Sequence, residues 1–280
     1  MEKYLFVGGD KRQEYAAGYI ERAGCDVNFA YTYTQLKSMI GMADCIVLPL
    51  PVSRDKVHIN SDPKTGLITV EEFVFLLEKG MTVMAGMPDA ELSDRIKGKG
   101  VELYDYYKNE TLTVLNSIST AEGVLYELIG NSDVNLNRSK ILVTGYGKAA
   151  SAIAKRLVAL GSEVVVAARS ERDRIAAYSD MCKAISLYEV ESVADRFDFV
   201  INTVPAVILG ENVISKLKKD CLMVEIASYP FGIDFKSAEK HGIKVIKAPS
   251  LPGRISPKSA GEAIAKTLLS IRKGTVTDLG

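Results

Sequence analysis

The stretch from Lys140 to Ser170 constrains the fold of this chain more than any other. It reads KILVTGYGKAASAIAKRLVALGSEVVVAARS, which is an apolar run, a glycine-rich turn, a helix pattern with one apolar face and a second apolar run. This order predicts a strand, a helix and a second strand. The turn has the G-x-G-x-x-G/A spacing, in which the first glycine permits a tight bend and the second permits a pyrophosphate to approach the backbone. We therefore expect a dinucleotide-binding turn formed by Gly145, Tyr146, Gly147, Lys148, Ala149 and Ala150.

The end of the second apolar run indicates which dinucleotide fits. Enzymes that use NAD place Asp or Glu here to bind the ribose 2′-hydroxyl. This chain instead has Ala168, Arg169 and Ser170, followed by Arg172 and Arg174. Because a guanidinium favours a 2′-phosphate, we expect NADP as the cofactor, with Arg169, Ser170 and Arg174 in its site. The alternative interpretation is an arginine cluster that only forms the solvated start of a helix.

Length and composition narrow the class of protein. At 280 residues the chain is near the size at which one core divides into two domains. Basic and acidic residues number 35 each, and this zero net charge gives no electrostatic reason to expect nucleic acid or membrane as a partner. We see no leader and no apolar run of about 18 residues, so we expect a cytoplasmic protein. Four cysteines without a C-x-x-C pair, and two histidines, argue against a metal site and a disulfide framework.

Residues 4–30 repeat the pattern of the central unit, with a strand, a glycine turn, a helix, a glycine and a strand. The turn, GGDKRQ from Gly8, carries charge where a dinucleotide-binding turn has small residues. We interpret it as a substrate-facing loop in which Lys11 and Arg12 pair with carboxylates. The alternative is a solvated loop without a ligand. His58 lies in a polar loop at 53–65 and is expected to be solvated.

Strand and helix patterns continue to alternate along the chain, which predicts parallel sheets covered by helices. The expected fold class is α/β, with two Rossmann-like doubly wound parallel-sheet domains in tandem and a cofactor cleft between them. We expect a substrate domain at 1–118 and an NADP-binding domain at 119–256, with the C-terminal helix 257–280 packing across the junction. Ligands bind at the carboxyl ends of parallel strands. Residues that follow the strands expected at 198–202 and 221–226 are therefore assigned to the cofactor site: Thr203, Val204, Pro205, Ala227 and Ser228.

The segment before the central unit is strand-like from Thr111 to Leu115, and a polar run follows it. In this run Ser119 and Glu122 have the spacing of a capping box, which favours Glu122 as part of a helix start over a catalytic carboxylate. Clefts between domains commonly bind ligands. The other polar side chains of the run are therefore candidates for holding a substrate: Asn116, Ser117 and Thr120.

Several motifs occur in the order found in a known family. They are GGDKRQ from Gly8, NSISTAEG from Asn116, GYGKAA from Gly145, INTVP from Ile201, ASYPFGIDF from Ala227 and APSLPGRISPKSAG from Ala248. With this ordered set the chain resembles the A subunits of dipicolinate synthases over nearly its full length. It departs from their pattern at Ala150 and Phe231, where glycine is expected, and at Ser250 and Ser256, which replace small residues.

The resemblance implies NADP-dependent oxidation of a tetrahydrodipicolinate-type or dihydrodipicolinate intermediate of the lysine pathway to pyridine-2,6-dicarboxylate during sporulation. It also implies a partner, the flavoprotein-like B subunit, and the mother-cell cytoplasm of a spore-forming bacterium as location. A homo-oligomer is expected. Two other classes stay open: a different NADP-dependent dehydrogenase for a hydroxy acid or amino acid, and a non-catalytic NADPH-binding regulatory subunit.

This oxidation requires that two carboxylates are held while a hydride leaves to the nicotinamide and a proton leaves elsewhere. We assign carboxylate recognition to Arg12, Arg254 and Lys258, with Asn116, Ser117 and Thr120. For Lys258 the alternative is a solvated lysine in a first helical turn. The proton acceptor stays open between Lys258, Glu122 and solvent.

Overall fold

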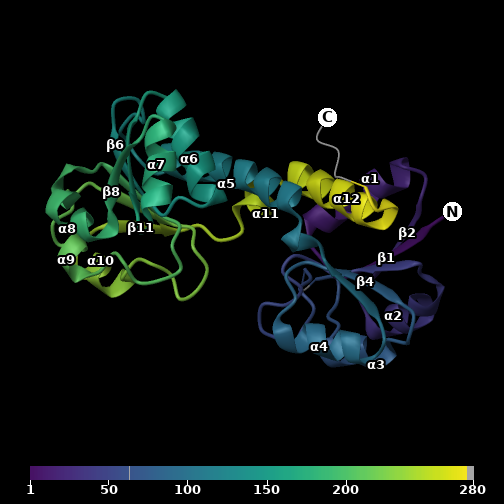
Figure 1. Ribbon diagram of the computed structural model, residues 1–280. Helices are drawn as coiled ribbons and strands as arrows, with labels where there is room; N and C mark the ends of the chain where they lie inside the picture. Colours follow the sequence, from purple (N-terminus) through teal and green to yellow (C-terminus); the bar gives the residue numbers. More distant parts are fainter. Residues whose placement is uncertain (63, 276–280) are drawn as a thin grey trace. The chain divides into compact units, whose positions relative to one another are not determined.

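The computed structural model describes residues 1–62 and 64–275. The chain divides into two compact units, Met1–Leu115 with Ser256–Gly280 and Asn116–Ile255 (Figure 1). Each unit is described by itself below. The boundaries between the units fall at 115/116 and 255/256. The boundaries expected from the sequence are 118/119 and 256/257.

The first unit contains a parallel sheet with the strand order β2-β1-β3-β4-β5. Its strands are β1 (Lys3–Val7), β2 (Asp26–Ala30), β3 (Cys45–Val47), β4 (Thr82–Ala85) and β5 (Glu102–Asp105). Its helices are α1 (Lys11–Arg22), α2 (Tyr33–Met39), α3 (Val70–Leu76), α4 (Ala90–Gly98) and α12 (Pro257–Lys273). The order reverses between β1 and β3, and the carboxyl ends of two such strands form the crevice in which open parallel sheets bind ligands.

Alternation along β1 explains why helices cover both faces of this sheet. Tyr4 and Phe6 enter one core, which they share with Ile20 of α1. Leu5 and Val7 enter the other, which contains side chains of α2, α3 and α4. A strand buried on both faces reads as a continuous apolar run, as β1 does from Tyr4 to Val7.

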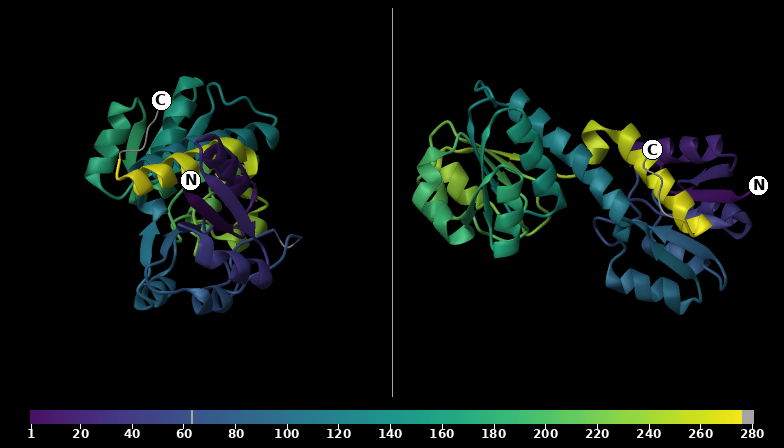
Figure 2. Two further views of the ribbon diagram at one scale, coloured as in Figure 1. Left: turned by 90° about the vertical axis from the view of Figure 1, so that its right-hand side faces the viewer. Right: turned by 45° about the horizontal axis from the view of Figure 1, so that its top comes forward.

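The C-terminal helix α12 packs against α1 within the first unit (Figure 2). Its apolar face, with Ile264 and Leu268, joins the same core as Ile20. Gly261 permits close approach, because a Cβ there would lie 2.5 Å from the carbonyl oxygen of Arg12. From the sequence, a helix is expected over 257–280 that packs across the junction. The helix ends at Lys273, and 276–280 lie outside the described residues.

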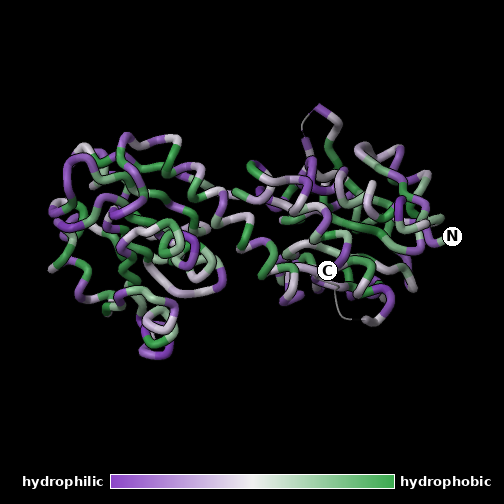
Figure 3. The backbone as a smooth tube through the Cα atoms, turned by 90° about the horizontal axis from the view of Figure 1, so that it is seen from above, coloured by the Kyte–Doolittle hydropathy of each residue, from purple (hydrophilic) through white to green (hydrophobic). Residues whose placement is uncertain are grey.

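The second unit has a parallel sheet with the order β11-β10-β9-β6-β7-β8, which is the Rossmann order. Its strands are β6 (Lys140–Thr144), β7 (Glu163–Ala168), β8 (Lys183–Ser186), β9 (Phe199–Asn202), β10 (Leu222–Glu225) and β11 (Lys244–Lys247). Its helices are α6 (Lys148–Ala159), α7 (Glu171–Ser179), α8 (Val190–Val193), α9 (Glu211–Ile214), α10 (Phe235–His241), α11 (Leu251–Ile255) and most of α5 (Glu110–Gly130). Hydrophobic segments run through the interior of each unit (Figure 3). The predicted α/β class with two parallel-sheet domains is confirmed.

The strand predicted over Thr111–Leu115 is wrong, because these residues begin the long helix α5. The β-branched residues of the segment suggest a strand, but Leu112 is fully buried in the structure. The side chain of Asn109 caps the helix, because its oxygen accepts a hydrogen bond of 3.1 Å from the backbone N–H of Leu112. The capping box at Ser119 is also wrong. Ser119 and Glu122 lie inside α5, far from its start, so Glu122 does not cap a helix.

Candidate functional site

The glycine turn of the second unit lies between β6 and α6. Gly145 has φ +82°, and a Cβ there would lie 2.8 Å from Oγ1 of Thr203, so the position requires glycine. Gly147 precedes α6 with an ordinary φ of −75°. A Cβ at Gly147 would meet nothing within 4 Å in the described chain. Gly147 therefore matters for the open space beside its backbone, and its backbone conformation does not require glycine.

The amino terminus of α6 is suited to an anion. Gly147 occupies the N-cap position of α6, and no side chain among the described residues caps this helix. In contrast, Ser170 caps α7 and Asp234 caps α10. The first N–H groups of a helix lack partners inside it, and they carry the positive end of the helix dipole. Open space beside Gly147 and an uncapped helix start are what a pyrophosphate needs, so this part of the unit fits a dinucleotide.

A cavity of about 550 Å³ lies at the same edge of the sheet. Gly145, Arg169, Ser170 and Val204, all expected in the cofactor site, line it. The cavity is also lined by residues that were not expected from the sequence: Asp173, Leu187, Tyr188, Ala206 and Ile208. Leu187 and Tyr188 follow β8, a short strand without a strong apolar run, so no sequence signal marked them.

The three polar residues expected to select NADP have different positions. Arg169 and Ser170 line the cavity, and the Ser170 hydroxyl also accepts a hydrogen bond of 3.1 Å from the backbone N–H of Asp173. Arg174 donates to the carbonyl oxygens of Ala168 and Arg169, at 3.0 and 2.9 Å. Arg174 therefore holds the backbone that carries Arg169.

Tyr146 contributes to the turn through its backbone, because its side chain is engaged elsewhere. Its hydroxyl donates a hydrogen bond of 2.6 Å to the carboxylate of Asp180, which also pairs with Lys155 at 3.2 Å. Burial and this bond raise the pKa of Tyr146, and the bond lowers the pKa of Asp180. Lys148 and Ala149 stand in the first turn of α6, and Ala150 is buried against the sheet.

A buried hydrogen-bond network fixes the segment after β10. Oε1 of Glu225 accepts hydrogen bonds from the side-chain amide of Asn202 at 2.7 Å and from the backbone N–H of Ala227 at 2.8 Å. Oε2 accepts from the backbone N–H groups of Gly232 and Ile233, at 2.8 and 3.0 Å. Four donors therefore satisfy a carboxylate that is 1% exposed.

The same network fixes the turn after β9. The side-chain oxygen of Asn202 accepts from the Thr144 hydroxyl at 2.6 Å and from the Val204 backbone at 3.2 Å. The Thr203 hydroxyl donates to the carbonyl oxygen of Thr144 at 2.7 Å. Thr203, Val204 and Ala227 are thus held in place, whereas Pro205 and Ser228 are exposed.

Phe231, which departs from the resembled family, has φ +68°. This is a conformation that glycine adopts freely, which explains why glycine suits the position. The Phe231 ring packs edge-on against Phe235 with centroids 5.6 Å apart. The ammonium of Lys247 lies 3.9 Å from the Phe235 centroid and 5.6 Å from that of Phe231. This aromatic and cationic packing stabilises the phenylalanine in a strained conformation.

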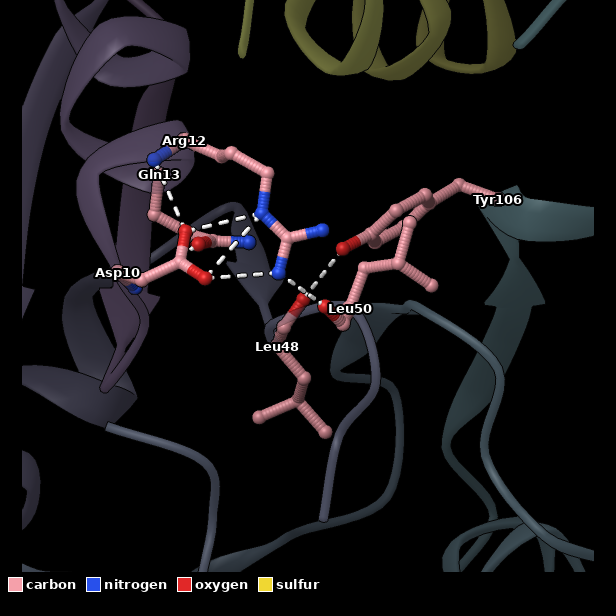
Figure 4. Close-up of polar contacts among 6 residues, drawn as sticks. All are labelled: Asp10, Arg12, Gln13, Leu48, Leu50 and Tyr106. Carbon is pink, nitrogen blue, oxygen red and sulfur yellow. Dashed lines mark hydrogen bonds and ion pairs between the residues drawn. The ribbon is translucent and has the colours of Figure 1, made fainter. Parts of the chain in front are cut away.

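In the first unit, Arg12 is 5% exposed and pairs with Asp10 (Figure 4). Its Nε lies 3.0 Å from Oδ1 and its Nη2 2.7 Å from Oδ2 of that carboxylate. Nη2 also donates to the carbonyl oxygen of Leu50 at 2.5 Å, and nearby the Tyr106 hydroxyl donates to that of Leu48 at 2.9 Å. Arg12 therefore joins the loops that follow β1 and β3, with its charge compensated by Asp10.

The other expected substrate-binding residues come from three helices, α5, α11 and α12. Arg254 donates to Glu127 at 3.1 Å, and Glu127 also accepts from Asn131 at 3.3 Å. The remaining members lie on helices: Asn116, Ser117, Thr120 and Glu122 on α5, and Lys258 in the first turn of α12. Thr120 donates to the carbonyl oxygen of Asn116 at 2.8 Å. Glu122 and Lys258 are exposed.

Two kinds of feature are absent from the described residues. No cluster of three or more His, Cys, Asp or Glu side chains within residues 1–62 and 64–275 has a geometry that fits a metal ion. Over the same part of the chain, no helix combines the length and the apolarity that crossing a bilayer requires.

Comparison with known proteins gives the relationships of both units. The family of the N-terminal domain of the dipicolinate synthase A subunit matches residues 3–107. The family described as "S-adenosyl-L-homocysteine hydrolase, NAD binding domain" matches residues 116–265. The second unit is therefore a pyridine-nucleotide-binding domain, in agreement with its glycine turn and open helix start.

Full-length relatives agree with these matches. The A subunit of dipicolinate synthase from Bacillus subtilis (strain 168) is 29% identical over 281 residues, which cover 95% of this chain and 94% of the relative. Crystal structures of dipicolinate synthase A subunits are similar at 25% identity, with TM-score 0.84 for the Bacillus halodurans protein (96% of this chain and 97% of that one) and 0.85 for the Bacillus subtilis protein (98% and 96%). The chain therefore resembles dipicolinate synthase A subunits over nearly its full length, and through residues 116–265 it belongs to the family of NAD-binding domains described for S-adenosyl-L-homocysteine hydrolase.

Proposed function

We propose that this protein is the NADP-dependent dehydrogenase subunit of a dipicolinate synthase, and that it oxidises a dihydrodipicolinate-type intermediate to pyridine-2,6-dicarboxylate. The observation that carries the proposal is the nucleotide edge of the second unit. There the uncapped start of α6 adjoins a cavity lined by Arg169 and Ser170. The resemblance to dipicolinate synthase A subunits suggests the substrate class, and the resembled motifs run from Gly8 to the C-terminal helix.

The choice of NADP over NAD rests on charge at the end of β7. Arg169 and Ser170 offer a guanidinium and a hydroxyl where enzymes that use NAD have a carboxylate. Asp173 also lines the cavity and opposes a phosphate. Asp173 stands three residues beyond the Ser170 cap, in the first turn of α7, whereas Arg169 directly follows the strand. Position therefore favours Arg169 as the residue that meets the ribose substituent.

The residues that would hold NADP are those of the turn, the cavity and the two fixed segments after β9 and β10. When bound, NADP supplies the hydride acceptor. The protein's own contribution is to hold the pyrophosphate on the backbone N–H groups at the start of α6, and to orient the segments after β9 and β10 through Asn202 and Glu225.

Substrate recognition belongs to the same proposal. We retain Arg254, Lys258, Asn116, Ser117 and Thr120 as candidates for binding the two carboxylates, and Glu122 and Lys258 as candidates for accepting a proton. Arg12 is proposed to shape the first unit's loops, because its guanidinium already binds Asp10 and Leu50. Partnership with a flavoprotein-like B subunit, self-association and the mother-cell cytoplasm are proposed from the family resemblance.

A substrate panel tests the proposal against a different dehydrogenase. The purified protein, with and without the B subunit, is given NADP and either freshly generated dihydrodipicolinate, a set of 2-hydroxy acids or a set of amino acids. We expect NADPH to form with the first substrate only. Formation of NADPH with a hydroxy acid or amino acid, and none with dihydrodipicolinate, contradicts the proposed substrate class.

A further inference from the structure

Tyr146 is the residue of the glycine turn that has a side chain, since Gly145 precedes it and Gly147 follows it. Glycine adopts many backbone conformations, so neither neighbour fixes the direction of the peptide groups by itself. A side-chain contact that orients the turn must therefore be made by Tyr146. Its ring is 9% exposed and packs in the same core as Ile153 of α6.

The Tyr146 hydroxyl is bound to a carboxylate at the end of α7. It donates a hydrogen bond of 2.6 Å to Oδ2 of Asp180. The backbone N–H of Asp180 donates to the carbonyl oxygens of Ala176 and Ala177, at 3.2 Å each, and this fixes the carboxylate to the helix. Burial, above all, raises the pKa of Tyr146, and the bond from Tyr146 lowers the pKa of Asp180. The hydroxyl therefore remains a donor, and the carboxylate an acceptor, near neutral pH.

Asp180 has a second partner that does not belong to the turn. Nζ of Lys155, on α6, lies 3.2 Å from the same Oδ2, and the Lys155 side chain is 55% exposed. An exposed ion pair contributes little to stability, whereas a hydrogen bond from a mostly buried hydroxyl to a charged acceptor contributes more. The bond to Tyr146 is therefore the stronger of these two contacts of the carboxylate.

The sheet holds the start of the same turn. The backbone N–H of Gly145 donates to the carbonyl oxygen of Ala167 on β7 at 2.8 Å. Thr203 lies against Gly145, where a Cβ would be 2.8 Å from its Oγ1. These contacts fix the point at which the chain leaves β6. The bond from Tyr146 to Asp180 fixes the turn one residue further on, directly before the uncapped start of α6 at Gly147.

We propose that Tyr146 is a positioning residue for the pyrophosphate of the nucleotide, and that it acts through its hydrogen bond to Asp180. The proposal deepens the proposed function and rests on it, because it takes the start of α6 as the pyrophosphate site. The bond holds the turn in the orientation in which its backbone N–H groups face that site. A loop that is already held in its bound conformation binds more tightly, because less ordering is left to occur on binding. The Tyr146 side chain itself contributes no contact to the ligand.

This role distinguishes ligands by whether they contain a pyrophosphate. NADPH and NADH both contain one, whereas adenosine 2′-monophosphate has only the phosphate assigned to Arg169 and Ser170. We expect Tyr146→Phe to lower the affinities for NADPH and NADH by the same factor, about three- to tenfold, which is the range that ordering one flexible group costs. Its affinity for adenosine 2′-monophosphate should stay within about twofold of wild type. Arg169→Ala should instead lower the affinities for NADPH and adenosine 2′-monophosphate and leave that for NADH unchanged.

Variants of the two partners of Asp180 test the bond itself. Asp180→Ala removes the acceptor and should cause the same loss as Tyr146→Phe. The double variant should lose no more than either single one, because both substitutions remove one interaction. Lys155→Gln keeps the bond to Tyr146 and should leave all three affinities within about twofold of wild type.

The first unit supplies a matched control. Tyr104, on β5, also donates a hydrogen bond to a carboxylate, that of Glu102 at 2.5 Å. Tyr104→Phe removes the same hydroxyl and the same kind of bond in the other unit. It should change none of the three affinities.

The test is calorimetric titration of the full chain with NADPH, NADH and adenosine 2′-monophosphate, with urea unfolding to check that each variant is folded. Because Asp180 is partly exposed, Asp180→Ala provides the test if Tyr146→Phe does not fold. An equal loss of affinity for all three ligands would show a merely structural role and overturn the proposal. NADPH affinity within about twofold of wild type in these variants would also overturn it, as would additive losses in the double variant. Wild-type protein that binds neither NADPH nor NADH contradicts the proposed function itself, and the role of Tyr146 then falls with it.

Discussion

The side-chain amide of Asn202 donates a hydrogen bond of 2.7 Å to the carboxylate of Glu225, and the two residues are 0% and 1% exposed. Together they couple the carboxyl ends of β9 and β10, because Asn202 also accepts from Thr144 and Val204. Glu225 accepts from three backbone N–H groups as well. The shape of the nucleotide edge therefore depends on a charge in the interior of the second unit.

Replacing Glu225 by glutamine should destabilise the second unit. An amide puts two hydrogens where the carboxylate only accepts, so at least one backbone or side-chain donor loses its partner. We expect a loss of about 2–3 kcal/mol in the free energy of unfolding, measured in urea. Glu191→Gln, which removes an exposed pair with Lys216, should change it by less than about 1 kcal/mol. Equal effects of the two substitutions would contradict the role of Glu225.

Replacing Arg169 by alanine should lower the affinity for NADPH by about ten- to a hundredfold, because a charge-assisted bond to the 2′-phosphate contributes about 1.5–3 kcal/mol. NADH, which lacks this phosphate, should bind as it does to wild type. Fluorescence titration with each nucleotide measures both constants. Arg172→Ala is the matched control, since Arg172 is an exposed arginine in the first turn of α7 that does not line the cavity. Comparable affinity of the wild-type protein for NADH and NADPH would contradict NADP specificity.

The two glycines of the turn should separate folding from binding. Gly147→Ala should leave the unfolding midpoint unchanged, because φ is −75° and the described chain leaves the Cβ open space. The added methyl group should nevertheless lower the affinity for NADPH, because it would contact the pyrophosphate. Gly145→Ala should cost about 1–2 kcal/mol of stability, because φ is +82° and Thr203 is close. Unfolding curves and NADPH titrations check both, and full NADPH affinity in Gly147→Ala would contradict the assigned turn.

The pair of Glu211 and His241 should give an acid-dependent contribution to stability. Hydrogen bonds from His241, above all, and from Lys240 and Ser237 lower the pKa of Glu211 from an ordinary 4.5 to about 2. A lowered pKa in the folded state means that the contribution is fully present above about pH 4.5 and is lost as pH falls towards 2. Thermal midpoints of wild type and His241→Asn should therefore differ at pH 6 and converge at pH 2. A difference independent of pH would contradict this assignment.

The parts of the fold that local chemistry determines can be predicted from sequence. Around Gly145 the apolar runs, the glycine spacing and the helix face all agree, and the structure has that strand, turn and helix. The segment from Thr111 fails because its β-branched residues suggest a strand, whereas burial of Leu112 in the core decides for a helix. Local propensity yields there to tertiary packing.

The site could be predicted only where its residues lie close together in the chain. Arg169 and Ser170 directly follow an apolar strand and are marked by it, whereas Leu187 and Tyr188, which line the same cavity, follow a strand without a strong apolar run. Glu225 likewise appears in sequence as an acidic residue ending an apolar strand. Its partners Asn202, Gly232 and Ile233 meet it only in the folded unit.

The most direct test of the proposed activity follows NADPH and pyridine-2,6-dicarboxylate together by absorbance, after NADP is mixed with freshly generated dihydrodipicolinate and the protein, with and without the B subunit. We predict that both products appear in equal amounts and at the same rate in at least one of the two mixtures. Tight NADPH binding without formation of either product in both mixtures would contradict a catalytic role and favour a protein that only senses the nucleotide.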